Sequence, residues 1–179
     1  MSEFREFQKI ARLSRDCVIT EKLDGTNASV YIGEDGAFLV GSRTRWITPE
    51  NDNYGFARWA FDHKEELLLL GHGHHFGEWW GAGVQRRYGL TEKRWSLFNT
   101  HRWSDPVARP SCCHVVPVLA QGVFHSALVD EALELLRSHG SQAAPGFANP
   151  EGIVIYHAAA KTLFKKTLDK DDEWKGKQR

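Results

Sequence analysis

The sequence predicts one α+β domain in which antiparallel β-sheets are flanked by helices. Residues 28–42, "ASVYIGEDGAFLVGS", contain two alternating runs around a turn bracketed by glycines, which is typical of a β-hairpin. Residues 126–138, "SALVDEALELLRS", form the clearest amphipathic helix, with Ser126 as the expected N-cap. A chain of 179 residues without internal repeats or low-complexity linkers suits a single domain.

The first half of the chain supplies further elements on both sides of the hairpin. Phe4, Phe7 and Ala11 recur at helical spacing and predict an opening helix of about three turns. Residues 17–22, "CVITEK", alternate as a strand that carries Lys22 at its C-terminal end. Residues 54–70 place aromatics and leucines at helical intervals.

The second half of the chain is rich in predicted strands. These are "HFGEWWG" (75–81), "RWSLFNT" (94–100), "GIVIY" (152–156) and "KTLFKKT" (161–167). Between residues 101 and 125, "DPVARP" indicates a loop and "HVVPVL" is compatible with a strand. We expect the domain to occupy residues 1–168, followed by a charged tail at 169–179 and no separate C-terminal domain.

Composition limits the class of protein. Twenty-three basic and 23 acidic residues cancel, so binding to nucleic acid would rely on local clusters rather than bulk charge. Seven Trp and ten Phe indicate a thick core, a stacking surface, or both. Three cysteines do not make a disulfide framework, and neither a signal peptide nor a membrane-spanning run is visible, so we expect a cytoplasmic protein with no membrane partner. The basic clusters are Arg43 with Arg45, Arg86 with Arg87, Lys93 with Arg94, and Lys165 with Lys166.

Residues 20–27, "TEKLDGTN", set Lys22 beside a glycine turn at the end of a predicted strand. A lysine acts as a nucleophile only as the neutral amine, whereas an unperturbed lysine has a pKa of roughly 10.4. Burial and neighbouring cations lower that value. The four-residue pattern from Lys22 to Gly25 is equally compatible with a solvated strand end, so it does not decide between the two interpretations.

Six short motifs follow one another in order over residues 21–167: "EKLDGTN", "GSR", "FGEWWGAGVQ", "WSLFNT", "EGIVIY" and "LFKKT". Together they make the sequence similar to the covalent nucleotidyltransferase superfamily of polynucleotide ligases and mRNA-capping enzymes, and above all to ATP-dependent RNA ligases of the RNA ligase 2 type. The resemblance implies the adenylation-domain fold and a reaction in which Lys22 carries AMP.

The resemblance also implies a role for each matched residue. Lys22 would attack the α-phosphorus of ATP, and AMP would then pass to an RNA 5′-phosphate that is sealed to a 3′-hydroxyl. Glu78 and Glu151 would bind Mg or Mn, for which carboxylate oxygens are suitable ligands. The remaining nucleotide-binding residues would be Glu21, which accepts from the adenine amino group, Asn27, Arg43, Phe98, which stacks on the base, Lys165 and Lys166.

Three departures from the family pattern keep alternatives open. Asn99 stands where the family usually has aspartate, Thr167 where it commonly has a second lysine, and only about a dozen residues follow "LFKKT". The expected partners are ATP and RNA ends or a nicked duplex, and a partner protein could replace the missing C-terminal domain. The alternatives are a DNA ligase, a capping-type guanylyltransferase, or a non-catalytic module that binds nucleotides or RNA ends.

Overall fold

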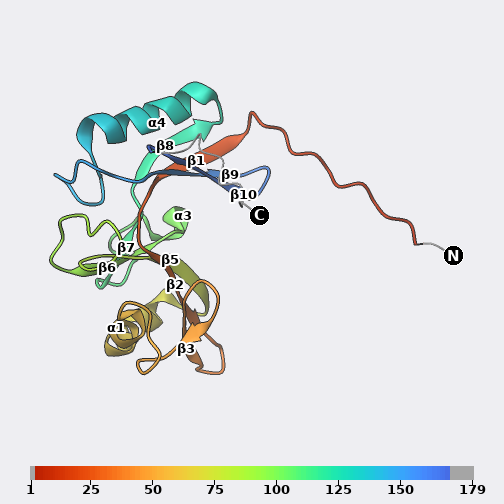
Figure 1. Cartoon of the computed structure of the whole chain (residues 1–179). Helices are drawn as coiled ribbons and strands as arrows, with labels where there is room; N and C mark the ends of the chain where they lie inside the picture. Colours follow the sequence, from red (N-terminus) through yellow and green to blue (C-terminus); the bar gives the residue numbers. More distant parts are fainter. Residues whose placement is uncertain (1–2, 170–179) are drawn as a thin grey trace, which may run out of the picture.

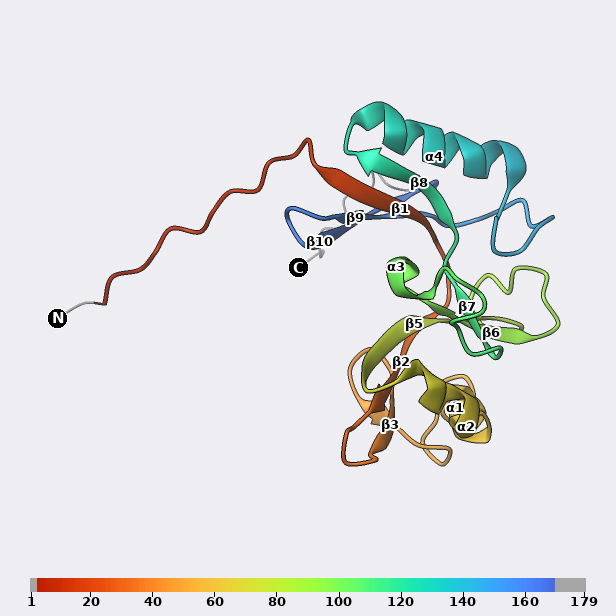
Figure 2. The same cartoon turned by 180° about the vertical axis from the view of Figure 1, so that it is seen from behind.

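The computed structural model describes residues 3–169 and contains two β-sheets, each covered on its outer face by helices (Figures 1 and 2). Sheet A has the strand order β10-β9-β1-β8 and sheet B the order β4-β3-β2-β5-β6-β7. All neighbours pair antiparallel except β6 and β7, which pair parallel. The mixed helix and strand content and the antiparallel sheets confirm the predicted class.

Sheet A is formed by β1 (Asp16–Lys22), β8 (Val118–Val123), β9 (Gly152–His157) and β10 (Thr162–Thr167). Its outer face packs against α4 (Ser126–His139). Buried residues of β1 and β9, such as Ile19 and Ile155, contact the apolar side of α4, including Leu133. Residues of β1 alternate, so Cys17, Ile19 and Glu21 face α4 while Lys22 faces the other way.

Sheet B and its helices form the larger core. The strands are β2 (Thr26–Ile32), β3 (Phe38–Gly41), β4 (Trp46–Ile47), β5 (Gly73–Gly81), β6 (Lys93–Leu97) and β7 (Cys113–Val115). The helices are α1 (Phe56–Asp62), α2 (Lys64–Leu67), a 3₁₀ turn η1 (Leu68–Leu70) and α3 (Thr100–Trp103). Phe56 of α1 lies against Trp79 and Trp95, with ring centroids 5.3 and 5.4 Å apart. Many of the tryptophans therefore serve the core, as the composition indicated.

The chain crosses from sheet A to sheet B immediately after Lys22. Strand β1 ends at Lys22 and β2 begins at Thr26, so residues 23–25 form the connection between the two layers (Figure 1). Leu23 is buried there in a small third cluster that includes Trp80 and Tyr88. The predicted nucleophile therefore stands at the junction of the two sheets.

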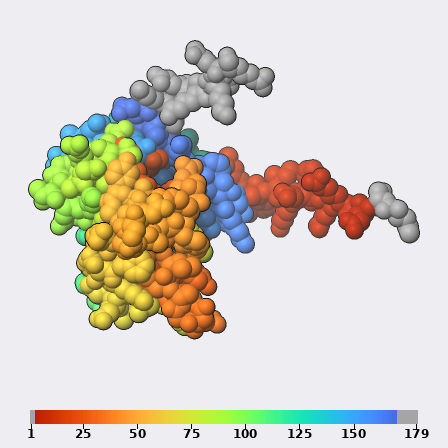
Figure 3. All heavy atoms as spheres, turned by 60° about the horizontal axis from the view of Figure 1, so that its bottom comes forward, coloured from red at the N-terminus to blue at the C-terminus, as the bar shows by residue number. Residues whose placement is uncertain are grey.

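Two local predictions were wrong. Residues 3–12 contain no helix, and the segment projects from the body in an extended conformation with Phe4 93% and Phe7 85% exposed (Figure 3). An isolated helix of this length is marginal in water, and these side chains have no surface to pack on. The N-cap of α4 is His125 rather than Ser126, because the His125 Nδ1 accepts from the Leu128 amide at 3.1 Å.

None of the helices between residues 3 and 169 is both long and apolar enough to cross a membrane. Of the predicted tail, only Asp169 lies among the described residues.

Candidate active site

Lys22 and Glu151 meet between the two layers. The Lys22 Nζ donates to the Glu151 Oε2 at 2.5 Å, and the two side chains are 23% and 16% exposed. Glu151 directly precedes β9, whose Gly152 opposes Lys22 in the sheet register. Gly152 has φ +151°, and a Cβ there would stand 2.3 Å from the Lys166 carbonyl oxygen. Only glycine fits this position, because any side chain would collide with the backbone of β10 next to Glu151.

Glu78 approaches the same site from sheet B. It lies on β5 opposite Asn27 of β2, and its carboxylate accepts from the Gly25 amide and the Asn27 Nδ2, both at 3.1 Å. Burial raises the pKa of Glu78 to about 7, and the negative charges of Glu151 and Asp24 act in the same direction. Lys22 and the Gly25 amide oppose the shift. Two carboxylates from different sheets thus converge on one lysine.

The crossing at residues 23–25 is held tightly on the side of sheet B. A Cβ on Gly25 would lie 2.3 Å from the Trp79 carbonyl oxygen, so only glycine allows β2 to begin here. The Asp24 amide donates to the Tyr88 hydroxyl at 2.8 Å. Tyr88 is buried against Trp80, with ring centroids 4.8 Å apart, and burial raises the pKa of its phenol, which therefore keeps its proton.

Arg86 connects this crossing to the loop that carries Glu151. Its Nε donates to the Asp24 Oδ2 at 2.9 Å, and its Nη1 donates to the carbonyl and side-chain oxygens of Asn149 at 3.1 and 3.2 Å. The guanidinium therefore ties the residues after Lys22 to the residues before Glu151. The sequence suggested that Arg86 could hold a nucleic-acid backbone, but the structure uses its donors inside the protein.

Glu21 lies on the other side of sheet A from Lys22. It is 1% exposed, and its Oε2 accepts from the amides of Gln142 and Ala143 at 2.8 and 3.0 Å. Burial raises the pKa of this carboxyl, against the effect of those hydrogen bonds. Its Oε1 is buried and has no hydrogen-bond partner among the described residues. The predicted contact of Glu21 with adenine stays a prediction.

Phe98 follows the end of β6 and is 42% exposed, so it is not a core residue. Its amide donates to the Phe76 carbonyl at 2.9 Å, which places the two residues next to each other on the face of sheet B that carries Glu78. Asn99 is the N-cap of α3, with its Oδ1 accepting from the Arg102 amide at 3.1 Å. The departure at Asn99 therefore has a structural role.

The remaining predicted residues are Arg43, Lys165 and Lys166. Among the described residues, neither Arg43 nor Lys165 forms a hydrogen bond or ion pair with the lysine or the two carboxylates of the site. Arg43 is exposed in the turn between β3 and β4. Strand β10 is regular, so Lys165 and Thr167 face the side of Lys22 while Lys166 faces the opposite side. Lys165 is two strands from β1, about 10 Å at the usual strand spacing. The Lys22 Nζ is in contact with the Glu151 carboxylate, and its charge also acts on the carboxylate of Glu78.

Sequence reasoning missed the roles of Asp24, Arg86 and Tyr88. Asp24 belongs to the motif "EKLDGTN" and Arg86 to a basic cluster with Arg87, but no local pattern showed that the two residues pair. The signal in the sequence was the pair Gly83 and Gly89, since glycines indicate a turn that must bend sharply. In the structure Gln85, Arg87 and Tyr88 between them have positive φ angles.

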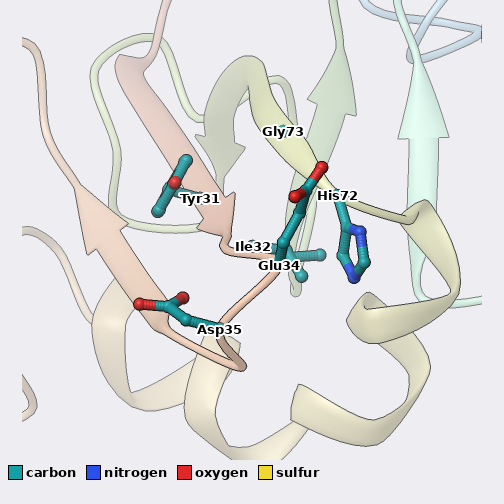
Figure 4. Close-up of a pocket in the computed structure, with 6 residues that line it drawn as sticks. All are labelled: Tyr31, Ile32, Glu34, Asp35, His72 and Gly73. Carbon is teal, nitrogen blue, oxygen red and sulfur yellow. The ribbon is translucent and has the colours of Figure 1, made fainter.

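A separate hollow of about 460 Å³ lies at the tip of the first hairpin (Figure 4). Its lining comes from the β2–β3 turn and the start of β5, and it includes Glu34, Asp35 and His72. It contains neither Lys22 nor the carboxylates around it. This hollow is therefore separate from the candidate site around Lys22.

The sequence profile of the RNA ligase family matches residues 15–168. The chain belongs to the RNA ligase family. This match covers all the strands and helices described above, together with Lys22, Glu78 and Glu151. A comparison with curated protein sequences found no significant match.

Solved structures of Naegleria gruberi RNA ligase share the fold. A glutamate-to-alanine mutant with ATP and Mn has a TM-score of 0.65 and 21% identity, covering 92% of this chain and 53% of that one. An apo aspartate-to-alanine mutant has a TM-score of 0.61 and 22% identity, with 87% and 50% covered. The present chain spans about half the length of these RNA ligases. The predicted nucleotidyltransferase fold is confirmed.

Proposed function

We propose that this chain is the adenylation module of an ATP-dependent RNA ligase. The observation that carries the proposal is the contact of Lys22 Nζ with Glu151 at 2.5 Å, beside the buried Glu78, in a chain of the RNA ligase family. Lys22 is 23% exposed and its amine is held by Glu151, which gives it the fixed position that a covalent nucleophile needs.

In the first step, Lys22 Nζ attacks the α-phosphorus of ATP, the N–P bond forms and pyrophosphate leaves. The attacking nitrogen must lose a proton, and Glu151 Oε2 is hydrogen-bonded to that nitrogen. The lysyl-AMP then passes AMP to the 5′-phosphate of an RNA, and a 3′-hydroxyl attacks the activated end and releases AMP.

Glu78 and Glu151 fit a divalent cation. Carboxylate oxygens suit Mg or Mn, and such ions are commonly held by one or two carboxylates plus substrate phosphates. When bound, the ion would neutralise charge on the phosphates. Some of the Naegleria gruberi RNA ligase structures hold ATP or AMP with Mn.

Several residues would bind the nucleotide. Phe98 would stack on the adenine, and Glu21 would accept from its amino group. Asn27 keeps Glu78 in place through its side-chain amide. Arg43 and Lys165 would contact ribose or phosphate groups, whereas Lys166 lies on the opposite face of β10 from Lys165.

The test is the intact mass of the protein after incubation with ATP and Mn, beside a Lys22→Ala control. We expect an adenylate on the wild type and none on the variant. An adduct that forms equally on both proteins would overturn the assignment of Lys22. Parallel incubation with GTP distinguishes a capping-type guanylyltransferase, and RNA binding without an adduct under either metal would indicate a non-catalytic module.

A further inference from the structure

Four rings form a row on the face of sheet B that carries Glu78; we call it the aromatic row, and it consists of Phe76, His74, Tyr31 and Trp46. Along β5, Phe76 and His74 lie two and four residues from Glu78 and point to the same side. At the usual rise of a strand, they are on the order of 7 and 13 Å from Glu78. The row therefore begins beside the nucleotide site and leads away from it.

The rings are exposed although they hold one another in place. Phe76 is 56% and Trp46 50% exposed. His74 stacks on Trp46 with centroids 5.6 Å apart and planes 22° apart. It also lies 4.7 Å from Tyr31 and 5.3 Å from Phe76. Rings fixed in this way lose little conformational freedom when a planar ligand stacks on them.

Trp46 is further fixed by a glycine. A Cβ on Gly41 would lie 3.3 Å from the Trp46 Cε3 and Cζ3 atoms, so the indole covers Gly41 closely. Trp46 also stands at the end of the turn that contains Arg43 and Arg45, both exposed. A cationic turn next to an exposed ring is the combination that binds single-stranded nucleic acid, by backbone attraction and base stacking.

Beyond Tyr31, at the β2–β3 turn, the surface next to the aromatic row is acidic. Glu34 and Asp35 occupy the β2–β3 turn just beyond Tyr31 and line the hollow of Figure 4. Carboxylates repel phosphates, so a strand that follows the row would not continue over this turn. The row therefore offers room for a few nucleotides.

Resting on the function proposed above, we propose that the aromatic row stacks on unpaired bases of the RNA strand whose end lies at Lys22. Stacking requires free base faces, which single strands offer and the interior of a duplex does not. Exposed rings alone would also suit a protein partner, but the arginines beside Trp46 and the continuity with the nucleotide site favour RNA. The substrate class is thus a single-stranded RNA end.

The experiment measures binding of a fluorescent, 5′-phosphorylated single-stranded RNA by anisotropy, beside the same RNA in a duplex. It is done without ATP on the full chain, with Trp46→Ala, Trp46→Phe and Phe164→Ala. Phe164 is a matched control because it is 52% exposed, on sheet A, and lies on the α4 side of β10. Thermal unfolding of each variant verifies that it is folded.

We expect Trp46→Ala to weaken single-strand binding by roughly 5- to 150-fold, the range for loss of one base–aromatic stack. Trp46→Phe should retain most of the affinity and Phe164→Ala all of it, and the duplex should bind more weakly than the single strand. Unchanged affinity in Trp46→Ala would overturn the inference, as would equal binding of duplex. If Trp46→Ala abolished self-association and left RNA affinity unchanged, the aromatic row would be a protein contact, and this result would also overturn the inference.

The two proposals fail separately. Adenylation of the wild type by ATP tests the proposed function and does not involve the RNA. A protein that forms the adenylate but whose RNA affinity is insensitive to Trp46 would leave the proposed function standing and remove only the aromatic row.

Discussion

Glu78→Gln tests the electrostatics of the site through stability. The pKa of Glu78 is raised to about 7 from an ordinary 4.5, chiefly because the carboxyl is buried. Between these values the folded protein holds a proton that the unfolded chain has released. The free energy of unfolding therefore falls as the pH rises from about 4.5 to about 7. A shift of about 2.5 pKa units corresponds to about 3 kcal/mol.

Glutamine keeps the size of the side chain and an oxygen acceptor for the Gly25 amide, but it does not ionise. The difference in unfolding free energy between Glu78→Gln and wild type should therefore grow with pH, favouring the variant by about 3 kcal/mol more at pH 8 than at pH 4. The measurement is urea unfolding across this range, in a chelator and without ATP. Glu134→Gln, on an exposed residue of α4, reports the effect of removing a carboxylate that is not buried.

A difference that stays constant with pH would refute the reasoning, because it would mean that Glu78 ionises equally readily in the folded and unfolded chain. A difference that grows in the opposite direction would mean that attraction by the Lys22 charge outweighs the effect of burial on Glu78.

Two other substitutions test the connection between the sheets. Gly25→Ala places a Cβ 2.3 Å from the Trp79 carbonyl oxygen, so we expect about 2–4 kcal/mol of destabilisation in thermal unfolding. The control, Gly36→Ala, should cost about 1 kcal/mol, because only its positive φ is unfavourable. Equal losses would show that the backbone at residues 23–25 can relax. Arg86→Lys removes the guanidinium that joins Asp24 to Asn149, so the rate of adenylation should fall by about tenfold. Arg87→Lys, an exposed residue in the same turn, should leave the rate unchanged. Equal rates in both variants would show that Arg86 does not position the site.

The parts of the site that sequence predicted are those that local patterns determine. Strand alternation and the glycine turn placed Lys22 at the end of β1, and the motif order of the family placed Glu78 and Glu151 at the same centre. The pairing of Asp24 with Arg86 joins positions 62 residues apart, and nothing in either neighbourhood indicates it. Such a contact follows from how the two sheets meet, which one sequence does not show.

The opening helix failed for a related reason. Phe4, Phe7 and Ala11 satisfy a helical period, but a helix in a protein is stabilised mainly by burying its apolar side. In the described chain these side chains have no such surface, and Phe4 is almost fully exposed. The spacing of these residues is helical, but spacing alone does not show whether the chain offers a surface for the apolar side to pack on.

The site depends on the relative placement of the two sheets. Glu151 directly precedes β9 of sheet A, Glu78 lies on β5 of sheet B, and Lys22 ends β1, from which the chain crosses to sheet B. Three separate contacts fix that placement: the Gly25 amide to Glu78, the Asp24 amide to Tyr88, and Arg86 across to Asn149. A change in any of them would move one carboxylate relative to the lysine without removing a reacting group. Loss of adenylation in a variant of these residues, with the fold intact, is therefore evidence about geometry rather than about chemistry.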